Sequence, residues 1–208
     1  MHTADYSDFT VSVLHLPEDA SNWNLVYDFL SLRRKVFIEK MKWQLMDTNG
    51  IEFEQYDIVG LASYVIAHSG TEVIAGARII RCDKTMGQYS YMIRDAYLGK
   101  IDLPSDLCDK EPPVDPQSWE LTRLVSNHKD PAVAKAVLDV ANDYIYEQNG
   151  TRCLFLGPPS FLKMARKYGY EAEKLGRITG DESGRFLAFQ CEVINRPERS
   201  LSMGSKLE

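Results

Sequence analysis

Residues 118–157 read SWELTRLVSNHKDPAVAKAVLDVANDYIYEQNGTRCLFLG, and this stretch decides the fold. Residues 118–126 alternate apolar with polar side chains, which predicts a strand. Asp130 is a good N-cap and Pro131 suits the first helical position, and apolar residues then recur at helical spacing up to a closing glycine. Residues 152–157 are a short apolar run typical of a buried strand. The stretch therefore predicts a strand–helix–strand unit.

The sequence on either side predicts more strands and two more helices. Residues 63–68 and 72–81 predict two strands joined by a Ser-Gly hairpin turn, and residues 22–41 predict an amphipathic helix. Residues 160–168 predict another helix, and residues 185–193 predict a closing strand. This order implies a mixed, twisted sheet with helices on both faces, which is an α/β/α sandwich. The pattern alone also fits other α/β sandwiches.

Length and charge limit the domain count and the kind of partner. The 208 residues suit one domain, which we assign to residues 1–195, with a polar tail at residues 196–208. The net charge of −6 argues against a nucleic-acid-binding protein. We therefore expect neither a nucleic-acid partner nor, because no apolar run is long enough, a membrane span. The sequence does not predict an oligomeric state.

The cysteines and the first residues predict the compartment. The four cysteines form no Cys-x-x-Cys motif, and no His pair has metal-ligand spacing, so we expect no metal site. Residues 1–10 lack the apolar segment of a signal peptide. We therefore expect a reduced, cytoplasmic protein.

The predicted N-terminal helix carries an arginine on its apolar face. Arg33 and Phe37 lie one turn apart, and Trp43 follows the helix. A guanidinium can bind a carboxylate through two parallel hydrogen bonds, and the two aromatic rings can face an adenine or a sulfonium ion. Alternatively, both rings belong to the core and Arg33 extends to solvent.

Acidic residues precede a second unusual arginine. Glu52, Glu54 and Asp57 place three carboxylates within six residues, which suits a site that holds a cation or orients an arginine. A solvated acidic loop is the alternative. Arg78 lies at the centre of an apolar strand and needs a partner, because a lone buried charge is costly. The acidic segment can supply that partner, either in a structural ion pair or in a catalytic site.

A candidate general base lies in the strand at residues 118–126. Glu120 and Thr122 point to one face, and Arg123 points to the other unless the strand is bulged. A half-buried carboxylate can have a raised pKa and act as a general base. The alternative is an ion pair within the sheet.

Together and in this order, these segments resemble the acyl-homoserine-lactone synthases, or LuxI-type autoinducer synthases. The resemblance covers roughly residues 32–170. It departs at Glu54, where most members have Asp, and at residues 80–82, where many members have Leu-Pro-Thr in place of Ile-Arg-Cys. The matching motifs are Arg33-x3-Phe37-x5-Trp43, Gly50-x-Glu52-x-Glu54-x-Tyr56-Asp57, Gly76-x-Arg78 and Trp119-Glu120-x-Thr122-Arg123.

The resemblance implies an N-acyltransferase (GNAT)-like sandwich and a quorum-sensing enzyme without a tightly bound cofactor. Family members use S-adenosylmethionine and an acyl-phosphopantetheine thioester, usually of acyl carrier protein and sometimes of coenzyme A. The amine attacks the thioester carbonyl. The methionine carboxylate then closes the lactone and releases 5′-methylthioadenosine.

The resemblance also implies residue roles. Glu120 is the expected base, acting through a water, and Arg78 and Arg123 complete the catalytic group. The expected S-adenosylmethionine cleft comprises Arg33, Phe37, Trp43, Glu54 and Asp57. The expected acyl pocket comprises Leu121, Val137, Ala141, Leu154, Phe155, Leu156 and Phe186.

Two further expectations concern the acyl donor. Members that prefer 3-oxo chains often carry Thr where this chain has Phe155, so we expect an unsubstituted chain. An acidic carrier protein needs a basic docking surface, although an ordinary solvated helix face also explains such a cluster. The candidates are Lys129, Lys135, Arg152, Lys163, Arg166 and Lys167.

Two other functions compete with this interpretation. An acetyltransferase that uses acetyl-coenzyme A shares the sheet, but it usually carries an Arg/Gln-x-x-Gly-x-Gly/Ala loop that holds the pyrophosphate. The Gly-Pro-Pro at residues 157–159 offers no comparable run of free N–H groups. A catalytically inactive, ligand-binding relative is suggested only by Glu54, which keeps the usual negative charge.

Overall fold

The computed structural model describes residues 1–181 and 184–196. Its helices are η1 (Ala20–Asn22), α1 (Trp23–Arg33), η2 (Arg34–Lys40), α2 (Met92–Tyr97), η3 (Ser105–Leu107), α3 (Pro131–Glu147) and α4 (Pro159–Lys167). Its strands are β1 (His2–Asp5), β2 (Thr10–His15), β3 (Asp47–Thr48), β4 (Ile51–Glu52), β5 (Ala62–Ser69), β6 (Glu72–Arg81), β7 (Ser118–Ser126), β8 (Arg152–Gly157), β9 (Ala172–Lys174), β10 (Thr179–Asp181) and β11 (Gly184–Glu192).

The main sheet is mixed, as predicted. Its strands run in the order β1-β2-β5-β6-β7-β8-β11-β10, and β9 also pairs with β11. Neighbours are antiparallel except β7 and β8, which are parallel and joined through α3. This parallel pair confirms the predicted strand–helix–strand unit. The short strands β3 and β4 form a separate hairpin.

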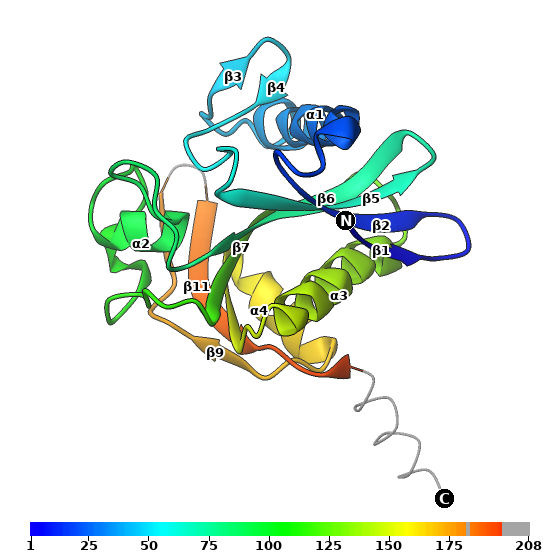
Figure 1. Cartoon of the computed structure of the whole chain (residues 1–208). Coiled ribbons are helices and arrows are strands. Elements are labelled where there is room, and N and C mark those ends of the chain that lie inside the picture. Colours follow the sequence, from blue (N-terminus) through cyan, green and yellow to red (C-terminus); the bar gives the residue numbers. More distant parts are fainter. Residues whose placement is uncertain (182–183, 197–208) are drawn as a thin grey trace, which may run out of the picture.

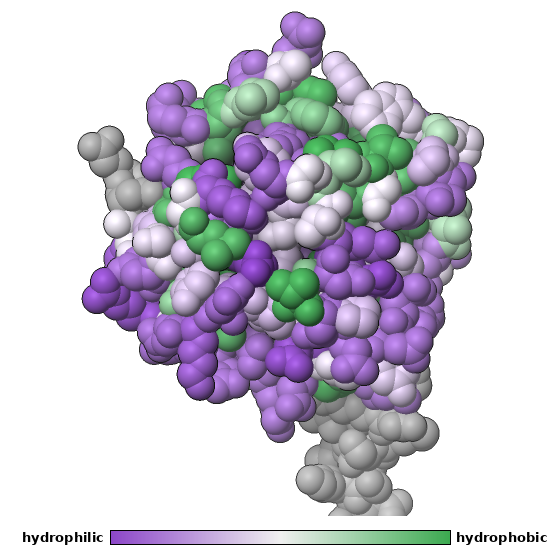
Figure 2. All heavy atoms as spheres, turned by 60° about the vertical axis from the view of Figure 1, so that its left-hand side comes forward, coloured by the Kyte–Doolittle hydropathy of each residue, from purple (hydrophilic) through white to green (hydrophobic). Residues whose placement is uncertain are grey.

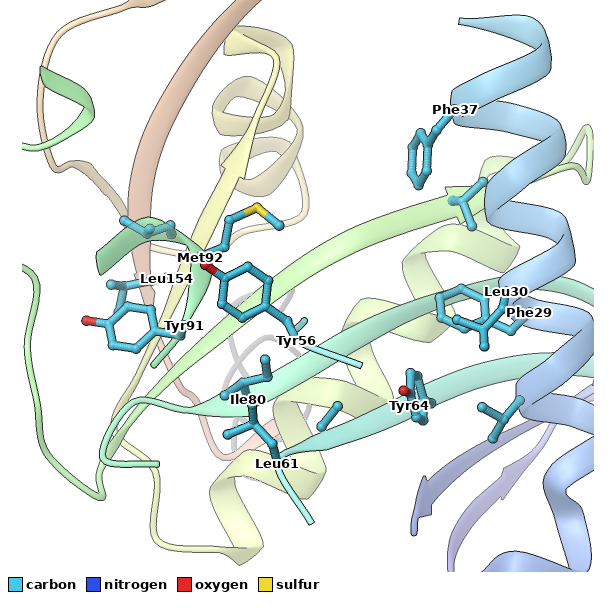
Figure 3. Packing of buried hydrophobic residues seen from close by; sticks show 14 of the residues in the cluster. Phe29, Leu30, Phe37, Tyr56, Leu61, Tyr64, Ile80, Tyr91, Met92 and Leu154 are labelled. Atoms are coloured by element: carbon cyan, nitrogen blue, oxygen red, sulfur yellow. The ribbon is translucent and has the colours of Figure 1, made fainter. Parts of the chain in front are cut away.

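Helices cover both faces of the sheet (Figure 1). On one face, Phe29 and Leu30 of α1 pack in a cluster with Tyr64 of β5 (Figure 3). On the other face, Val137 of α3 packs in a cluster with Val65, the next residue of β5. Successive residues of a strand point to opposite faces, so β5 contributes to both cores. The α/β/α sandwich is therefore confirmed.

The N-termini of α3 and α1 differ in how they are capped. Asp130 caps α3, since its side chain accepts a hydrogen bond from the N–H of Ala132 at 2.8 Å, as predicted. Asn22 is the N-cap of α1, but its side chain makes no capping hydrogen bond. The predicted helix at residues 22–41 is divided, because the α-helix ends at Arg33 and a π-helix follows.

The β1–β2 hairpin and α2 were not predicted from the sequence. The polar start of the chain hides β2, although Val11 and Val13 are buried. Helix α2 is six residues long, too short to show a helical period. Among the described helices, none has the length and apolar character to cross a membrane. Most of the predicted tail, residues 197–208, lies outside the described residues, so the proposed domain limits stay a prediction.

Gly76 of β6 allows α1 to pack closely against the sheet. We expect Gly76→Ala to destabilise the protein by about 1–3 kcal/mol through overpacking. A Cβ at this position would lie 2.7 Å from a ring carbon of Phe29 and 3.0 Å from the carbonyl oxygen of Val65. Urea unfolding measures the loss. Adding Phe29→Leu to the Gly76→Ala variant should cost less than the two single changes predict together, because the smaller side chain relieves the clash. Strict additivity would contradict this explanation.

Candidate active site

The parallel strands β7 and β8 separate along part of their length. They pair over Ser118–Leu121 and Arg152–Phe155, and beyond these residues β7 continues to Ser126. A cavity of about 530 Å³, which we call the cleft, opens beside this separation. Six residues predicted from sequence line it: Phe37, Trp43, Glu54, Arg123, Leu156 and Phe186.

Arg123 belongs to a β-bulge in β7. Arg78 pairs with Thr122 and Gly76 pairs with Val125, so two residues of β7 lie opposite one residue of β6. Arg123 has φ of 57°, which is uncommon for a residue other than glycine. The bulge resolves the alternative left open by the sequence, because it brings Arg123 to the acidic residues of the cleft.

Arg33 is fully buried and paired with two carboxylates. Its two terminal nitrogens donate to the two oxygens of Asp57 at 2.7 and 2.8 Å, and its Nε donates to Glu52. Such forked pairs are geometrically specific and stronger than neutral hydrogen bonds. The alternative in which Arg33 extends to solvent is therefore wrong.

Glu54 connects the other two arginines. One carboxylate oxygen lies 2.8 Å from Arg78, and the other accepts from Arg123 at 2.7 Å. Arg78 also contacts Asp57 at 3.2 Å and donates to the hydroxyl of Thr122 at 3.1 Å. The buried Arg78 of the apolar strand thus has the acidic partners that the sequence analysis expected.

Two carboxylates of this network, Asp57 and Glu54, have lowered pKa values. Burial alone would raise the pKa of Asp57, but Arg78 and Arg33 hold it well below its ordinary value. Burial also acts to raise the pKa of Glu54. The positive charges of Arg123 and Arg78 oppose this effect, and the pKa of Glu54 is lowered overall. Neither group is therefore suited to accept a proton near neutral pH.

Glu120 differs from Asp57 and Glu54, because its pKa is raised and not lowered. Its buried carboxylate accepts the N–H groups of Met92 at 3.2 Å and Ile93 at 2.7 Å, at the start of α2. Burial raises the pKa of Glu120 to about 7, although the Ile93 amide and Arg78 oppose the rise. Glu120 can thus gain or lose a proton near neutral pH. Met92, the donor of one of these bonds, lines the cleft.

Aromatic rings line the cleft beside the charged residues. Phe37 and Trp43 are stacked with ring centres 5.1 Å apart, and Phe186 meets Trp43 edge-on at 6.3 Å. The guanidinium of Arg123 lies 5.8 Å from the ring centre of Phe37. Phe37 lies in the π-helix η2, a form of helix that is frequent at functional sites.

A second, apolar cavity of about 50 Å³ lies between the sheet and helices α3 and α4. We call it the inner pocket. It shares Thr122, Leu124, Leu156 and Phe161 with the lining of the cleft, so the two cavities meet at these residues.

The predicted acyl-pocket residues divide between several places. Leu121, Ala141, Phe155 and Leu156 are among the residues that line the inner pocket, while Phe186 lines the cleft. Among the described lining residues of both cavities, Val137 and Leu154 are missing, which corrects the prediction for these two.

Strand geometry explains the correction for Leu154. It follows Cys153 and precedes Phe155, which face the inner pocket, so alternation turns it to the opposite face. There it belongs to the same cluster as Tyr91 and Met92 (Figure 3). Val137 is fully buried between α3 and the sheet.

Sequence reasoning missed several residues of the site. Glu52 was noted as one of three neighbouring carboxylates but was given no role in the site, although it pairs with two arginines. Tyr56 and Met92 line the cleft, and Met92 carried no sequence signal. Tyr170 and Phe189 line the inner pocket, far along the chain from the recognised motifs.

Comparisons with known proteins agree with one another. The profile of a family described as autoinducer synthase matches residues 19–171. An acyl-homoserine-lactone synthase of Pseudomonas aeruginosa is 30% identical in an alignment of 154 positions that covers 63% of this chain and 70% of that protein.

Solved structures share the fold. The coenzyme-A-dependent acyl-homoserine lactone synthase BjaI, solved with S-adenosylmethionine and isopentyl-CoA, has a TM-score of 0.76 and 17% identity, covering 89% of this chain and 84% of its own. The acyl-homoserine lactone synthase LasI has a TM-score of 0.75 and 19% identity, covering 91% and 92%. The expected GNAT-like fold is confirmed.

Proposed function

The chain belongs to the autoinducer synthase family and is an acyl-homoserine-lactone synthase, and we propose that S-adenosylmethionine and an acyl-phosphopantetheine thioester are its two substrates. The proposal rests on one observation. A cleft lined by charged and aromatic side chains adjoins an apolar pocket, because the two cavities share four lining residues. The charged S-adenosylmethionine and the apolar acyl chain of the donor can therefore meet at the residues that the cavities share.

The cleft suits S-adenosylmethionine. We assign the adenine and sulfonium to Phe37 and Trp43, since aromatic faces attract cations and stack on flat rings. Glu54 and Arg123 line the same cavity and can orient the ammonium and carboxylate of the substrate. The buried Arg33 and Asp57 hold these groups in position instead of contacting the substrate.

The reaction needs a proton acceptor and oxyanion stabilisation. Glu120 is the proposed base, acting through a water, because its pKa lies near neutrality while those of Glu54 and Asp57 are lowered. The edge of β7 beyond Leu121, which no longer pairs with β8, is the proposed source of N–H donors for the tetrahedral oxyanion. Lactone closure then requires only that the cleft hold the methionine carboxylate near its own γ-carbon.

Mass spectrometry of the products tests the proposed function. Purified protein is incubated with S-adenosylmethionine and a panel of acyl thioesters of coenzyme A and of acyl carrier protein. We expect an acyl-homoserine lactone together with an equal amount of 5′-methylthioadenosine. Acylation of another amine from acetyl-coenzyme A would favour the acetyltransferase alternative. Folded protein that releases no 5′-methylthioadenosine with any donor would favour the inactive relative.

The donor should lack a 3-oxo group. Phe155 lines the inner pocket and stacks on Phe189 with ring centres 5.0 Å apart, and a phenyl ring offers no hydrogen bond to a ketone. In competition between donors of equal length, we expect the unsubstituted chain to be preferred severalfold. A clear preference for the 3-oxo donor would contradict this and point to Thr122, which lines both cavities.

A carrier protein should dock near the cleft mouth. Lys163 is exposed on α4, which starts next to the cleft residues Gly157 and Pro158. We expect Lys163→Glu to raise KM for an acyl carrier protein donor several-fold and to leave KM for acyl-CoA unchanged. Arg152, at the opposite end of β8, is the matched control and should change neither value. Equal effects of both changes would contradict this docking site.

The other basic candidates are less suitable. Arg166 donates to the carbonyl of Ala172, and Lys135 pairs with Asp139. Figure 2 shows one face of the molecule as a mosaic of hydrophilic residues with separate hydrophobic groups, without one continuous apolar surface.

A further inference from the structure

Residues 193–196 follow β11 and lie along α3, and we call them the C-terminal strap. The side chain of Asn142 holds the backbone of Ile194 in both directions, donating to its carbonyl at 2.8 Å and accepting from its N–H at 3.0 Å. The N–H of Val193 donates to the carbonyl of Thr151 at 3.0 Å. The strap is thus fixed to the body of the protein by its backbone.

Arg196 fastens the end of the strap. Its Nε and one terminal nitrogen each lie 2.7 Å from a carboxylate oxygen of Asp143, and its other terminal nitrogen lies 2.5 Å from Asp139. These two acids are one turn apart on α3, so one guanidinium reaches both. Burial alone would lower the pKa of Arg196, but both acids raise it, which shows how strongly they favour the cation.

The strap lies at the far end of the inner pocket. Cys153 of β8 lies opposite Cys191 of β11 in the sheet, and both residues line that end of the pocket. Cys153 is four residues, or ~13 Å, along β8 from Gly157 at the mouth of the cleft. Val193 and Asn142 complete the lining there. The same residues that hold the strap therefore also form the wall that an extended chain would meet.

The wall is tied to its surroundings on more than one side. Tyr170 lines the pocket, and its hydroxyl donates a hydrogen bond to Asp139 at 3.1 Å. Asp139 is also a partner of Arg196. Asn142 cannot turn toward a ligand without losing both bonds to Ile194. Moving this wall outward thus requires several polar contacts to break together.

We propose that the C-terminal strap sets the maximum length of the acyl chain, with Arg196 as the positioning residue that keeps it closed. The proposal rests on the function proposed above. The inner pocket is small, with a volume of about 50 Å³. A longer acyl chain that extends along the residues lining this pocket would meet Val193 at its end.

The experiment measures acyl selectivity rather than total activity. Purified wild type and Arg196→Ala are given S-adenosylmethionine and straight-chain acyl thioesters of increasing length, and kcat/KM is determined for each. We expect Arg196→Ala to shift the optimum to longer chains, with the long-to-short ratio of kcat/KM rising about tenfold. Arg177→Ala, which removes an exposed arginine paired with Asp106, is the matched control and should leave the ratio unchanged.

A second variant acts in the opposite direction. Val193→Phe enlarges the wall, so it should remove activity with the longest donors that wild type accepts and spare the shortest. If Arg196→Ala does not fold, Asp143→Asn weakens the ion pair between Arg196 and Asp143 and should also raise the long-to-short ratio of kcat/KM.

The outcomes separate the two proposals. Absence of any acyl-homoserine lactone from folded wild type would overturn the proposed function. Normal product formation with the same length profile in wild type, Arg196→Ala and Val193→Phe would overturn the strap proposal alone. A uniform loss with all donors in the folded variants would also overturn it, because a purely structural role predicts that result.

Discussion

Replacing Glu120 with glutamine is expected to reduce product formation by about 100- to 10,000-fold, which is the usual contribution of a general base. Glutamine keeps the size of the side chain but cannot accept a proton near neutral pH. The variant should still fold, although its NH₂ group will face one of the two amides of Met92 and Ile93 that now donate to the carboxylate. Product formation by the purified variant measures the loss.

The pH dependence of activity distinguishes a base from a positioning residue. If Glu120 accepts the proton, wild-type kcat/KM should rise with pH through about 7, the pKa to which burial raises this group. That rise should be missing in Glu120→Gln. A variant that loses activity but keeps the same pH profile would show that Glu120 only holds α2 in place.

Stability provides an independent readout of the same group. The pKa of Glu120 is higher in the folded state, at about 7 against 4.5, so the folded protein binds the proton more tightly in this interval. Its contribution is full below pH 4.5 and is lost as the pH rises through about 7, by about 3 kcal/mol at most. Urea unfolding of Glu120→Gln should not show this fall.

A matched control uses the same substitution outside the site. Glu111 is exposed and paired with Arg94, so Glu111→Gln should leave turnover and its pH profile unchanged. Near-normal turnover by folded Glu120→Gln would contradict the proposed base, and Glu120 would then be a structural cap of α2.

The strand–helix–strand core was predictable because its signals are local. Asp130 caps α3 through a neighbouring N–H, and alternation along β7 depends only on adjacent residues. The four motifs were also predictable as a set, and the structure brings Arg33, Glu54 and Arg78 together. Local patterns thus gave the architecture and the identity of the charged residues.

The direction in which Arg123 points and the residues that end the inner pocket were not predictable, because both depend on non-local contacts. A bulge decides where Arg123 points, and it forms only when β7 pairs with β6. The amides that bind Glu120 come from α2, which has no helical period of its own. The end of the inner pocket is formed by Tyr170 and Val193, which no motif connects to the site.

Arg33→Ala is expected to destabilise the protein by about 3–5 kcal/mol, the usual cost of leaving buried charges without their partner. The guanidinium is fully buried and neutralises Asp57 and Glu52. Its removal leaves Arg78 as a partner of Asp57 and Arg123 as a partner of Glu52, so the network would lose its charge balance. Product formation should fall as well, since Glu54 and Arg123 depend on the same network for their positions.

Position 34 provides a control one residue away. Arg34 also pairs with two acids, Glu39 and Asp47, but on the exposed surface, so Arg34→Ala should leave stability close to that of wild type. The contrast between the neighbouring arginines isolates burial, because both changes remove one cation with two acidic partners. Equal stability of the two variants would show that burial of Arg33 does not have the energetic weight assigned to it.

The sign of the pH dependence completes the test of Arg33. In wild type, Arg78 and Arg33 overcome the effect of burial and hold the pKa of Asp57 well below its ordinary value. Asp57 therefore adds stability above its unfolded-state pKa, and this is lost only as the pH falls through its lower folded-state pKa. Without Arg33, the pKa of Asp57 rises and its neutral form is buried at less cost. The stability gap between wild type and Arg33→Ala should thus be widest at neutral pH and should narrow as the pH falls below the pKa that Asp57 has in the variant. A gap that stays constant down to the pH at which wild type unfolds would assign the loss to packing alone.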